Sequence, residues 1–294
     1  MKLFIKKIAA FSLLIVLTFV LSLIVISVVG SEKIVNKTNV NIVLGDSNTE
    51  CAINDHIINN TVNLSSSGDS YFYQYLKLKK IVSDNIKIDT LYLSFSPHNV
   101  YGNDWLFGES NKIETTFTHY FALMTIDEKL MLIKNKPKAV VFSVFKSPIR
   151  SAKLAVNYAL NKNYNYGGFN DINRNKLDIA IKKINETYQY KPMAIDEVKY
   201  LKAIVSFCKT NTIPLVFINT PKRKEILTFN NYRTIDFYNF YKTNFSEIPF
   251  LDYSGFLLSD NQYGDLTHLN ASGAKYFSNY LNTNGIYNSN YLFK

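Results

Sequence analysis

The chain has 294 residues, enough for one large domain and a smaller segment, and its 47% hydrophobic and 19% charged residues exclude a disordered chain. The net charge is +10, but the lysines form no long basic run, which argues against nucleic acid and suits an anionic glycan or lipid headgroup. Two cysteines, Cys51 and Cys208, exclude a disulfide scaffold and favour two separate buried thiols.

The N-terminal region reads as a membrane anchor. Residues 8–29 form an apolar run without charges that is long enough to cross a bilayer as a helix. A cleavable signal peptide would have a shorter apolar core and a better cleavage site than Val-Val-Gly-Ser, so we expect a retained anchor. Three lysines within residues 1–7 predict a cytoplasmic tail. The polar stalk at 30–38 and everything after it would then lie outside the cytoplasm, in the periplasm or at the cell surface.

Residues 39–294 alternate between strand-like and helix-like segments. Predicted strands are 39–44, 61–65, 88–96, 213–219 and 248–252. Predicted helices begin near residue 49, cover 70–84, 126–135, 139–160, 194–210 and 231–243, and end with one that starts near Ala271. This alternation predicts an α/β domain, in three layers, whose parallel sheet has helices on both faces. The stretch at about 100–190 fits the pattern loosely and is expected to be a helical and loop insertion.

Two short motifs lie at what should be one edge of this sheet. A Gly-Asp-Ser triplet at 45–47 follows the first strand, and a loop holding Asp265 and His268 lies just before the final helix. Because the carboxyl ends of parallel strands meet at one edge, these loops can lie together. A serine hydroxyl needs a base within hydrogen-bond reach, and that base needs an orienting acid. The sequence therefore predicts Ser47 as nucleophile, His268 as base and Asp265 as its partner.

The triplet alone is weak, because Asp46 and Ser47 would also serve as caps of the following helix. A second triplet, Gly68-Asp69-Ser70, likewise follows a strand and precedes a helix. If Ser70 were the nucleophile, no later glycine block would remain before the third strand. We therefore favour Ser47 and expect Ser70 to cap its helix.

The two blocks together resemble those of the SGNH/GDSL hydrolase superfamily, over residues 39–283. The resemblance implies an SGNH-like fold and makes Gly68 similar to the glycine whose backbone N–H joins the oxyanion hole. The third block of the family, a GxND sequence, is replaced here by Ser-Pro-His-Asn at 96–99. Asn99 is expected to supply the missing donor, with His98 and Asn103 as alternatives. This departure and the anchor look more like the branch that modifies exported polysaccharides, often by O-acetyl transfer.

The resemblance implies a membrane-anchored enzyme that transfers an acyl group, such as acetyl, to an envelope or exported glycan through an acyl-Ser47 intermediate. The expected partners are a glycan, an acyl donor and a membrane protein that supplies the acyl group. A carbohydrate esterase and a non-catalytic SGNH-like envelope protein for glycan binding or assembly are the alternatives; a lipase-like enzyme would also suit the anchor. No metal or other cofactor is expected, because the sequence has no HExxH, Cys/His cluster or Gly-rich nucleotide loop.

An aromatic loop at 161–170 offers a surface for a sugar ring. Tyr164, Tyr166 and Phe169 lie beside Gly167 and Gly168, which would permit the loop to close over a glycan. The alternative is an ordinary surface loop.

Overall fold

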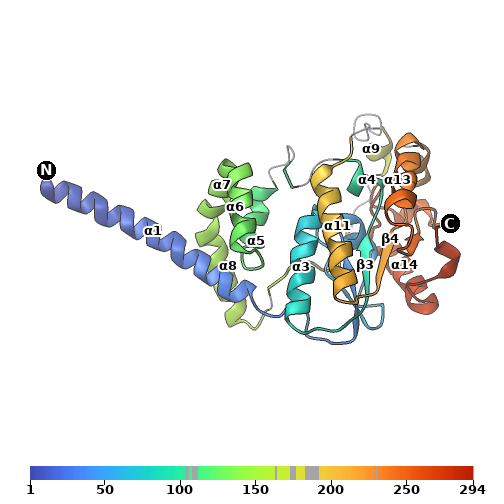
Figure 1. Ribbon diagram of the computed structural model, residues 1–294, viewed down its shortest axis with the longest axis horizontal. Coiled ribbons are helices and arrows are strands. Elements are labelled where there is room, and N and C mark those ends of the chain that lie inside the picture. The colour runs from blue at the N-terminus through green and yellow to red at the C-terminus, as the bar shows by residue number, and fades with distance from the viewer. Residues whose placement is uncertain are drawn as a thin grey trace. The chain divides into compact units, whose positions relative to one another are not determined.

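The computed structural model describes residues 1–102, 106–107, 112–162, 164–172, 177–182, 192–229 and 231–293, and it divides the chain into two compact units (Figure 1). An α/β unit contains Val35–Leu106 and Tyr166–Lys294. A helical unit combines Met1–Ile34 with Phe107–Asn165.

In the described residues of the α/β unit, five strands form one parallel sheet in the order β2-β1-β3-β4-β5. The strands are β1 (Val40–Leu44), β2 (Thr61–Asn63), β3 (Ile88–Ser94), β4 (Leu215–Asn219) and β5 (Phe250–Asp252). The central strands β1, β3 and β4 are buried at most of their positions, as expected where both faces of a parallel sheet are covered. The predicted α/β class and the parallel sheet are confirmed.

Helices flank this sheet. They are α2 (Ser47–Ala52), α3 (Tyr71–Ser83), α4 (Pro97–Val100), α9 (Leu177–Lys182), α11 (Ile195–Thr210), α12 (Lys224–Phe229), α13 (Asn231–Asn244) and α14 (Ala271–Asn284), with 3-10 turns η1 (Asp260–Gln262) and η2 (Ser289–Tyr291). The neighbours α3 and α11, cyan and gold in Figure 1, pack against each other. Helix α14 packs against α2 and adds Phe277 and Leu281 to a core that includes Val43 and Ile218.

Aromatic side chains fill much of the interior. Phe95 stacks on Phe217 with ring centroids 4.4 Å apart and lies 4.6 Å from the ring of Phe237. The high aromatic content therefore serves the core.

The two cysteines also lie in the interior. Cys51 and Cys208 are buried thiols, and burial raises the pKa of Cys208 to about 12.

The strand order places a topological switch point between β1 and β3 at the carboxyl edge of the sheet. The chain leaves β1 toward β2 at one edge, and leaves β3 toward β4 on the other side. Connections that diverge from adjacent strands open a crevice, which is where open α/β sheets bind ligands. Ser47 follows β1 and His98 follows β3, so both residues flank this position.

The helical unit contains α1 (Lys2–Gly30), α5 (Ile113–His119), α6 (Ile126–Asn135), α7 (Pro137–Phe145) and α8 (Ser147–Ala159). In the described part of the chain, α1 is the one helix long and apolar enough to cross a membrane. It begins at Lys2 rather than at residue 8, so the basic tail continues the helix. Helix α8 packs along α1.

Two expectations for the middle of the chain were wrong. The helix predicted at 139–160 is interrupted at Lys146, because Pro148 has no N–H for the continuing hydrogen-bond ladder. The loop at 161–170 does not present its tyrosines to a sugar: Tyr164 and Tyr166 are both buried. Burying a large aromatic ring is more favourable in free energy than leaving it exposed to solvent. A Cβ at Gly167 would lie 2.5 Å from the backbone oxygens of Leu64 and Ser65, so this segment packs directly against the backbone that follows β2.

A buried ion pair connects the loop after β2 to α3. The Lys77 ammonium lies 2.6 Å from the Asp69 carboxylate, and the two side chains are 0% and 3% exposed. Lys77 also donates to the carbonyl oxygen of Leu64 at 2.5 Å. The pair gives the second Gly-Asp-Ser triplet a structural role.

We expect Lys77→Met to lower the free energy of unfolding of the full chain by about 3–5 kcal/mol, because it leaves the Asp69 carboxylate buried without its cation. Adding Asp69→Asn should recover much of the loss, since no unpaired charge then remains buried. Urea denaturation in detergent measures both. Lys87→Ala, at an exposed loop position, should change stability by less than about 0.5 kcal/mol. Equal stability of Lys77→Met and Lys87→Ala would contradict the structural role.

Candidate active site

Ser47 occupies the first turn of α2, directly beyond β1. A Cβ at Gly45 would lie 2.1 Å from Thr49 Oγ1 and 2.5 Å from Ser94 Cβ, so only glycine lets α2 start this close to the end of β3. Asp46 caps the helix, because its carboxylate accepts the Asn48 N–H at 2.9 Å. The helix therefore starts at Ser47, two residues before the predicted position, with Asp46 as its cap and the half-buried side chain of Ser47 not used for capping.

The loop that carries Asp265 and His268 is closed on itself. The Gly264 N–H donates to the carbonyl oxygen of His268 at 2.9 Å. At the end of the loop Asn270 caps α14 by accepting the Gly273 N–H at 3.1 Å. A Cβ at Gly273 would lie 2.0 Å from the carbonyl oxygen of Gln262. Helix α14 and the loop therefore pack so closely that they fix each other.

The structure brings the three predicted residues together across 221 positions of sequence. His268 Nε2 lies 2.8 Å from Ser47 Oγ, and His268 Nδ1 lies 2.9 Å from each carboxylate oxygen of Asp265. Asp265 also accepts the backbone N–H groups of Thr267 and His268, both at 3.0 Å. This is the arrangement in which a histidine can take a proton from a serine hydroxyl.

The protonation of the acid is also set by its surroundings. Burial raises the pKa of Asp265, but the hydrogen bond and charge of His268, with the two backbone N–H donors, outweigh it and hold the pKa well below the usual range. The carboxylate therefore stays ionised at neutral pH. It holds the proton of His268 on Nδ1 and leaves the Nε2 lone pair facing Ser47.

A second His–Asp pair lies next to Ser47 in the structure. His98 Nε2 is 2.5 Å from Asp46 Oδ2, and the Asn99 amide donates to the same oxygen at 2.7 Å. Ser96 Oγ lies 2.7 Å from His98 Nδ1. Asn99 is buried and committed to Asp46, while the His98 side chain is 29% exposed. Of the three expected oxyanion donors, His98 is thus more accessible than Asn99, and Asn103 lies outside the described residues.

Lys222 is a residue that the sequence analysis missed. It is buried, and its Nζ donates to Thr220 Oγ1 at 3.2 Å and to the Thr267 carbonyl at 3.4 Å. Burial lowers the pKa of Lys222 to about 8, although Asp46 and Asp265 act in the opposite direction. The one signal in the sequence was a lysine just after a strand, at the same sheet edge as the motifs.

The electrostatic environment keeps Asp46 charged. Burial raises its pKa, but the charge and hydrogen bond of His98, the Asn48 N–H and the charge of Lys222 outweigh burial and hold the pKa far below the usual value. A negative charge thus persists immediately before Ser47, in contact with His98 and with Lys222 as a nearby cation.

Two backbone N–H groups at this edge have no hydrogen-bond acceptor among the described residues. The N–H groups of Ser47 and Gly68 make no hydrogen bond to any described residue, whereas the N–H of Asn48 is used by Asp46. Gly68 has a φ of 73°, a conformation that glycine adopts without strain. Unused N–H groups beside a nucleophile are the usual components of an oxyanion hole.

The second triplet is not equivalent to the first. Ser70 is the N-cap residue of α3, as expected, but its side chain makes no capping hydrogen bond. Its hydroxyl is buried and has no hydrogen-bond partner in the described structure. A substrate could not reach Ser70 without local opening, so the geometry favours Ser47.

Comparison with known proteins adds one finding. A model of an uncharacterised family matches residues 160–289, less than half of the chain, a segment that includes Asp265 and His268 but not Ser47. No curated protein has a significant match to the sequence.

We expect Gly273→Ala to slow the labelling of Ser47 by a fluorophosphonate probe roughly tenfold or more, because the added methyl displaces the loop that positions His268. Gly255→Ala is the matched control, since a Cβ there meets nothing within 4 Å. Labelling rates are compared in full-length protein with unchanged melting temperature. Equal rates for both variants would show that the packing at Gly273 does not set the position of His268.

Proposed function

We propose that the chain is a membrane-anchored serine acyl-ester enzyme of the SGNH type, which transfers an acyl group to an envelope or exported glycan. The observation that carries the proposal is the 2.8 Å contact between Ser47 Oγ and His268 Nε2, with Asp265 on the other ring nitrogen. A hydroxyl, a base and an orienting acid in this order are the parts that nucleophilic acyl transfer requires.

The proposed reaction has two half-reactions. Ser47 Oγ attacks the acyl carbon of the donor while His268 Nε2 takes the hydroxyl proton. The oxyanion that forms accepts hydrogen bonds from the N–H groups of Ser47 and Gly68. When it collapses, the bond to the donor oxygen breaks and His268 protonates the leaving oxygen. An acceptor hydroxyl then attacks acyl-Ser47 and loses its proton to His268. His268 returns that proton to Ser47 Oγ as the bond between Ser47 and the acyl group breaks, and the acylated acceptor leaves.

The expected third donor, Asn99, is bound to the Asp46 carboxylate, and His98 contacts the same oxygen through Nε2 and Ser96 through Nδ1. Because both side chains are engaged in these contacts, the proposed oxyanion hole relies on the N–H groups of Ser47 and Gly68.

The proposed location of the enzyme is supported by α1. An apolar helix with basic residues at its start favours a cytoplasmic N-terminus and an exported α/β unit. An anchored enzyme stays near glycans during export, and a membrane partner could deliver the acyl group. The esterase alternative uses the same acyl-enzyme with water as acceptor. With Tyr164 and Tyr166 buried, the glycan proposal rests on anchoring and not on that loop.

If the triad acts as a unit, Ser47→Ala and His268→Ala should each lower the turnover of a soluble aryl ester by about 10³-fold or more. The double variant should be little worse than either one, because triad members are strongly non-additive. Asp265→Ala should cost less. Ser70→Ala is the control and should keep its activity. An active Ser47→Ala beside an inactive Ser70→Ala would assign the nucleophile to the other triplet.

Transfer and hydrolysis are distinguished by the products. With a soluble acyl ester as donor, a carbohydrate acceptor should raise donor consumption and yield acylated sugar in wild type but not in Ser47→Ala. Mass spectrometry of the products measures this. If free acid is the only product across a range of acceptors that includes the organism's own glycans, the protein is an esterase and not a transferase.

A further inference from the structure

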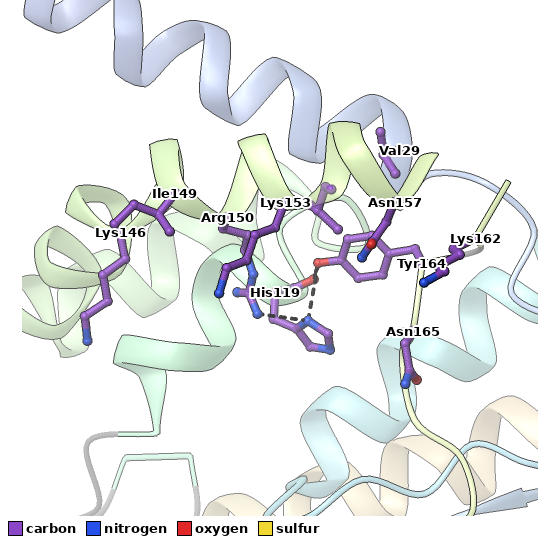
Figure 2. A pocket seen from close by; sticks show the side chains of 11 residues that line it. Val29, His119, Lys146, Ile149, Arg150, Lys153, Asn157, Lys162, Tyr164 and Asn165 are labelled. Carbon is purple, nitrogen blue, oxygen red and sulfur yellow. Dashed lines mark hydrogen bonds between the residues drawn. The ribbon is translucent and has the colours of Figure 1, made fainter. Parts of the chain in front are cut away.

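The helical unit contains a basic pocket formed by residues of α1, α5 and α8 and of the segment after α8 (Figure 2). Its volume is about 480 Å³, and it is lined by Val29, His119, Lys146, Ile149, Arg150, Lys153, Leu154, Asn157, Lys162, Tyr164 and Asn165. The lining has four cationic side chains and, among the described residues, no carboxylate. The charge of the pocket favours an anion.

Part of the lining is held in place by hydrogen bonds. Arg150 donates to the Thr115 carbonyl and to Thr118 Oγ1, each at 3.0 Å, and its guanidinium lies 3.2 Å from His119 Nδ1. The Tyr164 hydroxyl donates to the His119 carbonyl at 2.6 Å (Figure 2). The guanidinium is therefore positioned before any ligand arrives, which reduces the entropy cost of binding.

The other cations have little internal compensation. Lys146 forms a long ion pair with Glu114, whose carboxylate is 3.8 Å from its ammonium. In the described structure, Lys153 and Lys162 take part in no ion pair. Because like charges gathered in one pocket repel each other, a bound anion would stabilise the pocket.

The pocket lies alongside the second half of the anchor. Phe145, at the end of α7, packs edge-on against Phe19 of α1 with ring centroids 5.4 Å apart, and Val29 lines the pocket. Ten residues of helix separate Phe19 from Val29, which is about 15 Å, or about half of a hydrocarbon core. If α1 crosses the bilayer, the pocket faces one leaflet and its headgroups.

Helix α8 has the pattern of an interfacial helix. Lys146, Arg150 and Lys153 follow one stripe at helical spacing, while Ile149 and Val156 form an adjacent apolar stripe and are exposed. Further exposed apolar side chains of this unit are Ile126, Leu130, Ile133, Val141, Phe142, Phe145 and Leu160. Basic and apolar stripes on one helix favour a lipid surface, with acyl chains on one stripe and headgroups on the other.

We propose that this pocket binds the phosphate of an anionic membrane lipid in the leaflet that the helical unit faces. Lys and Arg side chains provide the charge, with Arg150 as the fixed donor fork. The exposed apolar stripe of α8 accommodates the acyl chains, which a free phosphate does not have. The proposal rests on the membrane anchoring proposed above but not on catalysis at Ser47.

The test uses the full chain in a neutral detergent. It is titrated with phosphatidylglycerol and with phosphatidylcholine, and bound lipid is counted by native mass spectrometry. Wild type should prefer phosphatidylglycerol. Lys153→Gln with Lys162→Gln should weaken that binding about 10- to 30-fold, whereas the matching arginine pair should retain it. Fluorophosphonate labelling of Ser47 should be unchanged in every variant.

The matched control is Lys134→Gln with Lys138→Gln, which removes the same charge at exposed positions of this unit outside the pocket. Equal loss in the two pairs would mean unspecific attraction and overturn the site. Displacement of the lipid by glycerol 3-phosphate at similar concentration would assign the pocket to a soluble anion instead. Release of wild type from membranes by carbonate would overturn the anchor, whereas retention without lipid preference would overturn the pocket alone.

Discussion

The buried carboxylate of Asp46 is the group around which the candidate site is built. One of its oxygens caps α2 through the Asn48 N–H, and the other accepts from Asn99 and contacts His98. These contacts join the ends of β1 and β3, the two strands where the sheet order diverges. Ser47 is the next residue, so its position depends on this one charge.

Close backbone packing supplies the second half of the site. Gly45 and Gly273 both lie where a methyl group would overlap a neighbour. Gly45 is in the turn that leads to Ser47, and Gly273 packs against the segment that leads to the loop of His268. Close-packed elements leave few alternative positions. The 2.8 Å contact between serine and histidine is therefore the outcome of two rigid connections, which is what preorganised acyl transfer requires.

The helical unit obeys a different physical constraint. Its exposed apolar side chains would be unfavourable in water but are suited to a bilayer surface. The basic pocket belongs to the same unit as α1, so anchoring and anion binding would be properties of one structure. The α/β unit, by contrast, encloses its aromatic residues in a core around Phe95 and Phe217.

Local patterns in the sequence were sufficient for the apolar run of α1, the alternation of strands and helices, and the loops that carry Ser47 and His268. Each of these features depends on residues close together in the chain. The two loops are expected at one edge because the carboxyl ends of parallel strands meet there. The pairing of Lys77 with Asp69, the role of Lys222, the contact of His98 with Asp46 and the burial of Tyr166 were decided by tertiary structure. They arise from desolvation and packing between distant segments, so the local sequence does not determine which of these side chains are buried or which partners they contact.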